Sequence, residues 1–324
     1  MSKTVTLLGV AAALALQPAL SLAQAWPTKA VRLIVPHPPG GPGDVPPRGF
    51  SQALQQALGQ PFVVENREGA DGLIGAEAVA KSAPDGYTFL ATSAGTMVVN
   101  PMLRKDASYD VSKFAPVIHT GTLQQIILAH PSVPGNSMKE MLDAAKGMPD
   151  KITVGSFGQV NLASLFQKWA KTKGVSLYPI PYKSASQSLQ AALANEVNII
   201  SFAAGPAAKL VQAGKLKALA ISPSRNEKLV PGTPSLREAG VNFDFTTWWG
   251  WFAPAGTPRD IVTRLNGEMG KLMKNPEFNG KFIASQGLVS DAPAGGSVEE
   301  FERFIRTETA EFQDLMKLLD LKPQ

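Results

Sequence analysis

The sequence predicts an α/β protein of two domains, each built around a parallel sheet. Short apolar runs rich in β-branched residues, which are typical of buried strands, repeatedly precede segments with apolar residues at helical spacing. Glycine and proline residues separate the two patterns, as they do in βαβ units. The chain has 324 residues, which is enough for two domains of ordinary size.

The first 25 residues have the pattern of a secretory signal peptide. Lys3 supplies a positive charge, an apolar segment follows over 7–16, and small residues around Ala23 and Ala25 suit cleavage. A buried N-terminal helix is the alternative. No later segment approaches about 18 uninterrupted apolar residues, so we expect a soluble, periplasmic mature protein that starts near Trp26.

The first domain is expected to begin with three strands that each lead into a loop. The strands are predicted over 31–35, 60–66 and 87–92. The loops after them are 36–44, 66–75 and 92–96. Ligands of open α/β sheets sit outside the carboxyl ends of the strands, so these loops are the expected binding region.

A second series of strands and helices indicates the second domain. Strands are predicted over 125–129, 151–155, 175–180, 197–202 and 216–222. Helices are predicted over 138–146, 162–172 and 188–194. The tryptophan-rich segment 248–258 should return the chain to the first domain, with Thr257 capping a further helix. We therefore expect a signal peptide over 1–25, the first domain over 26–122, the second over 123–230, and the return segment with the rest of the first domain over 231–324.

Composition excludes several classes of site. The chain has no cysteine, which rules out disulfides, thiolate catalysis and thiol-ligated zinc. Its net charge of +5 is mild, and the basic residues are scattered, so we expect no nucleic-acid partner. The three histidines, His37, His119 and His130, lack metal-ligand spacing, and neither a metal nor a cofactor is expected.

The first glycine loop is the strongest candidate for anion binding. A strand, a glycine loop and a helix in succession direct backbone N–H groups at one point, here around Gly40 and Gly41. An ordinary βα turn is the alternative. Asp44 is expected either to cap the following helix or to contact the ligand. His37 would make binding pH-sensitive if its pKa stays near neutrality, or it has a packing role.

Hydroxyl and amide side chains at other strand ends are further candidates. Ser93 and Thr96 follow the third strand of the first domain, whereas Ser156, Gly158 and Asn161 follow a strand of the second. Asn161 is alternatively a helix cap. Ser184 is a weaker candidate.

Enzyme motifs are incomplete. Residues 91–95 lack the first glycine of a nucleophile elbow, and residues 41–46 lack the last glycine of the dinucleotide fingerprint. We expect no catalytic residue. A secreted serine hydrolase that uses Ser93 or Ser156 with a histidine remains the alternative of another class.

Several segments, taken in order, resemble one known family. Residues 31–44 resemble its Ile-Val-Pro-Phe-x-x-Gly-Gly-x-x-Asp stretch, and Glu65-Asn66-Arg67 with the glycines up to Gly75 resembles its second motif. Further matching segments are 84–88, 100–101, 181–183, 214–220 and 253–258. The family is the Bug-type extracytoplasmic substrate-binding proteins of tripartite tricarboxylate transport systems, and the resemblance covers essentially the whole mature chain.

The resemblance implies a two-domain periplasmic binding protein fold of type II character, with hinged domains and an interdomain cleft. It implies capture of a small aliphatic or aromatic mono- or dicarboxylate and delivery to membrane permease subunits. We expect a monomer, and a binding protein that serves a sensor is an alternative. The implied ligand-binding residues are His37, Pro39, Gly40, Gly41, Asp44, Ser93, Thr96, Ser156, Gly158, Asn161, Ser184 and Ala203.

The chain departs from the family pattern at places that bear on ligand identity. His37 stands where the family has an aromatic residue, and Val45-Pro46-Pro47 follows Asp44 where small residues are usual. The segment 195–198 also differs from the usual Gly-x-Val-Asp.

Overall fold

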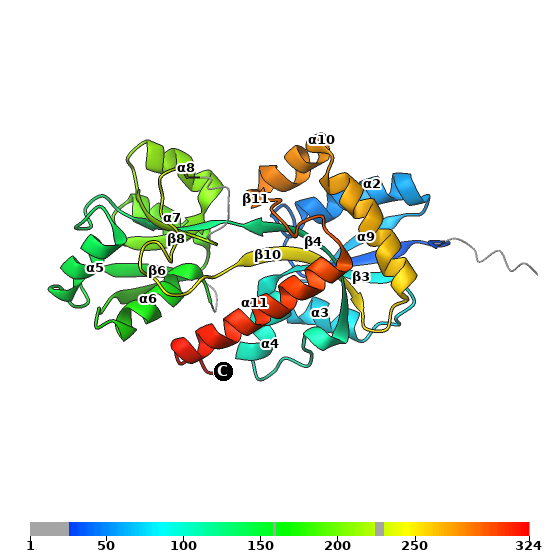
Figure 1. The fold of residues 1–324 in the computed structure, drawn as a ribbon, viewed down its shortest axis with the longest axis horizontal. Coiled ribbons are helices and arrows are strands. Elements are labelled where there is room, and N and C mark those ends of the chain that lie inside the picture. The colour runs from blue at the N-terminus through cyan, green and yellow to red at the C-terminus, as the bar shows by residue number, and fades with distance from the viewer. Residues whose placement is uncertain (1–25, 158–159, 224–229, 324) are drawn as a thin grey trace, which may run out of the picture.

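The computed structural model describes residues 26–157, 160–223 and 230–323. The predicted signal peptide lies outside these residues. Figure 1 shows two lobes side by side, each with one sheet flanked by helices. None of the helices in the described part of the chain is both long and apolar enough to span a bilayer.

The first lobe is built on a mixed sheet of order β11–β4–β10–β3–β1–β2. Its strands are β1 (Val31–Val35), β2 (Phe62–Asn66), β3 (Thr88–Ser93), β4 (Phe114–Leu123), β10 (Thr247–Pro254) and β11 (Leu288–Val289). β1 pairs in parallel with β2 and β3, as predicted. β10 is antiparallel to both β3 and β4 because it returns from the second lobe.

The second lobe has a sheet of order β7–β6–β8–β5–β9. Its strands are β5 (Gln125–Ala129), β6 (Thr153–Phe157), β7 (Tyr178–Tyr182), β8 (Ile199–Ala203) and β9 (Lys217–Ser222). β6 pairs in parallel with β7 and β8, whereas β5 runs antiparallel to β8 and β9. Each sheet therefore combines the predicted parallel pairs with antiparallel strands next to the crossings.

Helices cover both sheets. They are α2 (Val45–Leu58), α3 (Leu73–Ala80), α4 (Asn100–Leu103), α5 (Met138–Lys146), α6 (Leu162–Thr172), α7 (Ala185–Leu193), α8 (Ala204–Gln212), α9 (Arg259–Met273), α10 (Pro276–Phe278) and α11 (Val298–Leu318). Short helical turns occupy η1 (Ala70–Gly72), η2 (Gly95–Val99), η3 (Val111–Lys113), η4 (Asn279–Ile283) and η5 (Ala284–Gln286).

The chain passes between the lobes along two neighbouring segments. β4 continues through Gln124 into β5, and residues 245–246 lead back into β10. Leu123 pairs with Thr247 across β4 and β10, and Gln125 Nε2 donates to Thr247 Oγ1 at 2.7 Å. The two crossings thus lie side by side (Figure 1).

The tryptophan-rich strand β10 forms the centre of the first lobe. Trp248 and Trp251 are almost fully buried on the two faces of the sheet. Trp248 packs against Phe301 of α11, whereas Trp251 packs against Phe50 of α2. Alternation along the strand explains this division, because successive side chains point to opposite faces.

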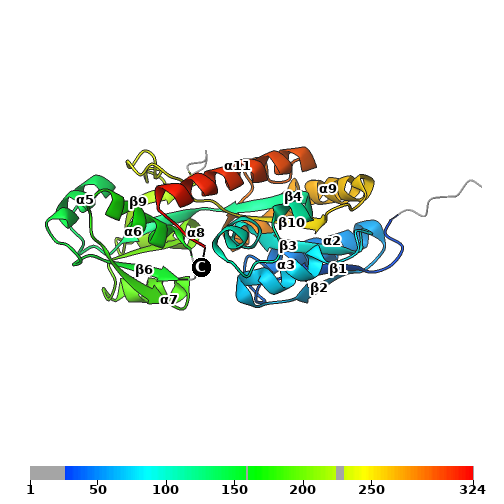
Figure 2. The same cartoon turned by 90° about the horizontal axis from the view of Figure 1, so that it is seen from below.

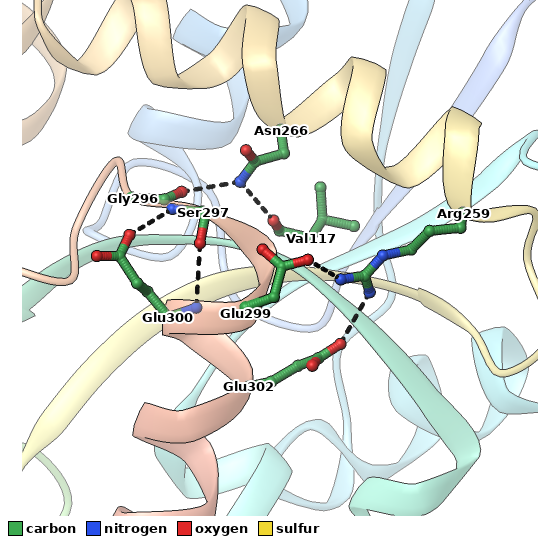
Figure 3. Close-up of polar contacts among 8 residues, drawn as sticks. All are labelled: Val117, Arg259, Asn266, Gly296, Ser297, Glu299, Glu300 and Glu302. Atoms are coloured by element: carbon green, nitrogen blue, oxygen red, sulfur yellow. Dashed lines mark hydrogen bonds and ion pairs between the residues drawn. The ribbon is translucent and has the colours of Figure 1, made fainter.

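Polar contacts fix the start of α11 on the first lobe (Figure 3). Ser297 and Glu300 form a reciprocal capping box, and Arg259 of α9 pairs with Glu299 and with Glu302. From this end α11 runs past the gap between the lobes, as Figure 2 shows. Its far end packs with residues of the second lobe in one shared hydrophobic cluster.

One predicted cap is wrong. Pro258, rather than Thr257, is the N-cap residue of α9, and no side chain caps the helix. Thr257 Oγ1 instead donates to the carbonyl of Pro254 at 2.8 Å, which closes the turn before the helix.

Candidate ligand-binding site

A cavity of about 680 Å³ is lined by residues of both lobes. The first lobe contributes the ends of β1, β2 and β3 with the loops after them. The second contributes the ends of β6 and β8 and the start of α7. Carboxyl ends of parallel strands therefore face one space, as the order of strands and loops predicted.

Five helical segments begin at this cavity. The residues that line it at or beside these N-termini are Gly72 (α3), Ala94 (η2 and α4), Asn161 (α6), Ala185 (α7) and Ala203 (α8). The first turn of a helix leaves N–H groups without intrahelical partners and carries partial positive charge. Each such terminus stabilises a nearby anion by about 0.3–1 kcal/mol at an exposed site and by more when partly buried. Some of these N–H groups already have partners, such as those of Ala163, Ser164 and Ala204, but the aligned partial charges of the termini still favour an anionic ligand.

Charged side chains on the cavity are acidic. Among the described residues that line it, those with a formal charge are Glu68 and Asp71. Asp71 Oδ2 lies 3.4 Å from Arg104 Nη1. A bound anion would thus be held by backbone N–H groups, hydroxyls and amides rather than by a lysine or arginine of the described lining.

Asn161 acts as the predicted helix cap. Its Oδ1 accepts from the N–H of Ser164 at 3.1 Å, and its Nδ2 donates to the carbonyl of Phe157. The side chain is buried and lines the cavity at the same time. The cap therefore orients the start of α6 toward the ligand space.

His37 lines the cavity as a neutral side chain. Burial lowers its pKa from 6.5 to about 4, because desolvation disfavours the charged imidazolium. Its ring lies 4.7 Å from the ring of Trp249, and Nε2 is 3.1 Å from Thr92 Oγ1. Of the two alternatives for His37, a pKa near neutrality is therefore not supported, and the ring packs on Trp249 while it lines the cavity.

Asp44 does not cap α2 with its side chain, contrary to one of its two expected roles. Its buried carboxylate instead accepts from the N–H of Gly40 at 3.0 Å, from Arg48 Nε at 2.9 Å and from Asn66 Nδ2 at 2.9 Å. Burial acts to raise the pKa of Asp44, but these hydrogen bonds outweigh it and hold the pKa below its usual value. One glycine N–H group of the first loop thus already binds a carboxylate of the protein itself.

The structure separates the predicted site residues into two groups. His37, Ser93, Thr96, Asn161 and Ala203 line the cavity. The predicted residues that are not part of its lining are Pro39, Gly40, Gly41, Asp44, Ser156 and Ser184. Ser184 caps α7 immediately before Ala185, and Gly158 lies outside the described residues.

The sequence analysis did not predict two groups of residues that line the cavity: the polar residues beside the crossings and three phenylalanines. Gln125 and Thr247 line the cavity next to the crossings, and Phe157, Phe202 and Phe245 line it from the side of the second lobe. The polar pair Gln124-Gln125, which interrupts apolar strand sequence, was a usable signal for the crossing. The phenylalanines had no such signal, since core strands contain the same residue type.

The serine hydrolase alternative gains no support from the contacts of the histidines. His37 pairs with Thr92, and His130 pairs with Ser132 at 2.8 Å. Ser93 and Ser156 are not the partners in either pair, so these two histidines are not placed to activate them.

Comparisons with known proteins identify the family. The family model described as "Tripartite tricarboxylate transporter family receptor" matches residues 47–321. BugT of Bordetella pertussis is 30% identical, over 94% of this chain and 96% of BugT. Rpa4515 of R. palustris, solved with adipate, has 28% identity and a TM-score of 0.74, over 92% of this chain and all of that one. MatC of Rhodopseudomonas palustris, solved with malate, has 28% identity and a TM-score of 0.71, over 90% and 99%.

These matches confirm the Bug-type resemblance and the two-domain binding-protein fold. The matching family is one of receptors rather than enzymes. With a family match over most of its length, the chain belongs to the tripartite tricarboxylate transporter receptor family.

Proposed function

We propose that this protein captures a small carboxylate between its two lobes in the periplasm and delivers it to membrane permease subunits. The observation that carries the proposal is the convergence of five helix N-termini on one cavity. Backbone N–H groups recognise a carboxylate through charge-assisted hydrogen bonds of roughly 1.5–3 kcal/mol each.

Two relatives support the carboxylate class. Rpa4515 was solved with adipate and MatC with malate, and the two structures match 92% and 90% of this chain. Both ligands are small carboxylates. We infer the same class for this chain, with the signal peptide over 1–25 directing export.

Closure about the two crossings would bring the lobes onto the ligand. β4 and β10 are hydrogen-bonded neighbours where they leave the first lobe, so the lobes can pivot there without separating. We propose a domain division that differs from the sequence prediction in the return segment, with 26–122 and 247–324 in one lobe and 123–246 in the other. Ser235 forms a bridge with Ile221 of β9, and Ser222 Oγ contacts Asp244, so the described residues of 230–246 belong with the second lobe.

Calorimetric titration against a panel of aliphatic and aromatic acids tests the proposal. The site variant is Asn161→Asp, because Asp also serves as a helix cap and adds a negative charge at the cavity. We expect its affinity for the identified acid to fall at least about tenfold, or 1.4 kcal/mol. Ser137→Asp at the N-cap of α5 makes a comparable change at a residue outside the cavity lining and should leave affinity unchanged.

Two results would contradict the proposal. Turnover of an acid or ester by the purified protein would point to an enzyme. Equal affinity in the wild type and Asn161→Asp, at unchanged stability, would place the carboxylate elsewhere. An uptake assay with the co-expressed permease then separates transport from service to a sensor.

A further inference from the structure

Glu68 places an uncompensated negative charge on the cavity. The residue is exposed, lines the cavity, and follows the end of β2. No hydrogen bond or ion pair of its side chain is found among the described residues. Its position is well defined, because the preceding Arg67 N–H donates to the carbonyl of Val35 at 2.9 Å.

The arginine side chains near this part of the cavity form ion pairs with other carboxylates. Arg67 pairs with Glu65, and Arg104 makes hydrogen bonds of 2.9 and 2.7 Å to Asp106. Arg104 also reaches the second acidic residue of the cavity, Asp71. Glu68 is therefore the carboxylate on this cavity that a ligand cation is best placed to neutralise.

The rest of the lining suits a ligand with two different ends. The helix N-termini favour a carboxylate, as argued above. Phe157, Phe202 and Phe245 offer partly exposed rings, and aromatic faces attract organic cations as well as apolar groups. Glu68 on the same cavity attracts a cation and repels a second carboxylate.

We propose that the ligand is a monocarboxylate that carries an amino or quaternary ammonium group, and that Glu68 determines this specificity. The inference rests on the proposed function and narrows it. It separates this chain from Rpa4515 and MatC, whose structures hold the dicarboxylates adipate and malate.

Three acids of equal chain length test the preference: 5-aminopentanoate, pentanoate and glutarate, which end in an ammonium, a methyl and a second carboxylate. Titration of the wild-type protein should give affinity in that order, with about a tenfold gap between the first and the last. Glycine betaine and its carbon analogue 3,3-dimethylbutanoate, which keeps the carboxylate but lacks the cationic nitrogen, extend the comparison to a quaternary ammonium group.

Glu68→Gln removes the charge at nearly constant size. We expect it to weaken 5-aminopentanoate about fivefold or more, to strengthen glutarate, and to leave pentanoate within twofold. Glu277→Gln is the matched control, because it removes an exposed carboxylate on α10 that is not part of the cavity lining. It should change none of the three affinities.

The outcomes separate this inference from the proposed function. If glutarate binds most tightly and Glu68→Gln changes nothing, the specificity is wrong while the carboxylate receptor stands. If neither these acids nor the wider panel binds, the proposed function itself fails.

Discussion

The two glycine loops of the first lobe look alike in sequence but are organised in opposite ways. Loop 36–44 and loop 66–75 each follow a strand, contain at least one glycine with positive φ and include one aspartate. The side chain of Asp44 is 3% exposed and is hydrogen-bonded inside its own loop, whereas that of Asp71 is 61% exposed. The second loop is held instead through the carbonyl of Asp71, which accepts from Asn100 Nδ2 at 2.8 Å.

A glycine-rich turn can bind an external anion only through N–H groups that have no partner within the protein. In the first loop an internal carboxylate takes the N–H of Gly40, so that donor is no longer open to a ligand. In the second loop the acidic side chain contacts Arg104, and Gly69, Asp71 and Gly72 line the cavity, where the N–H of Gly72 itself donates to the carbonyl of Gly69 at 3.0 Å. The following variants test this difference between the two loops.

Replacement of the two aspartates should give the largest difference. Asp44→Ala leaves Arg48, Asn66 and the N–H of Gly40 without a shared partner, and we expect a loss of about 3 kcal/mol in the free energy of unfolding. Asp71→Ala removes an exposed carboxylate and should cost less than about 1 kcal/mol. Urea denaturation measures both, and equal losses would remove the contrast between the loops.

His37 in the first loop should make the free energy of unfolding depend on pH. Since the pKa of His37 is about 4 in the folded protein and 6.5 without burial, only the unfolded chain takes up this proton between those values. Stability should therefore fall as pH drops from 6.5 to 4, by about 2 kcal/mol after allowance for partial exposure.

His37→Gln should flatten melting temperature against pH in this window relative to the wild-type protein. Carboxylates with lowered pKa values, such as Asp44 and Glu65, lose their contribution only from about pH 5 downward, and they do so equally in the wild type and the variant, so the comparison between the two isolates His37. An unchanged profile in His37→Gln would show that the imidazole is solvated in the folded protein.

Alanine at one glycine of each loop should give the smallest effect. Gly72 has φ +94°, and a Cβ there would lie 2.5 Å from Thr96 Oγ1, so Gly72→Ala should cost about 1–2 kcal/mol and weaken ligand binding. A Cβ at Gly41 would meet no atom within 4 Å, and the residue has no positive φ, so Gly41→Ala should be nearly neutral. Thermal unfolding and titration check both, and a loss of affinity in Gly41→Ala would restore the first loop to the site.

Local pattern predicted much of the fold. β1 and α6 have the predicted bounds. An apolar β-branched run and an apolar stripe at helical spacing are local sequence patterns, so they can be recognised without knowing which elements they pack against. β4 spans Phe114–Leu123, although only the apolar pair Val117 and Ile118 within it is strand-like in the sequence. Its polar residues, such as Thr120 and Thr122, are buried by β10, a strand more than a hundred residues away, and such long-range pairing leaves little local signal.

The sequence predicted where the candidate site lies, but it predicted less well which groups are available to bind a ligand. The cavity lies at the carboxyl ends of the strands, as predicted, and Ser93 and Thr96 are part of its lining. The partner of the Gly40 N–H group could not be read from the sequence, since an aspartate four residues later fits a helix cap equally well. The place of Gln125 depends on two segments meeting that are far apart in the chain.

The paired crossings also determine how the molecule deforms. Two strands joined by ladder hydrogen bonds and by the Gln125–Thr247 contact resist sliding past each other, because shear would break several bonds at once. Flexing the ribbon out of its plane keeps those bonds intact. We therefore expect the softest collective motion to be a swing about an axis across the ribbon.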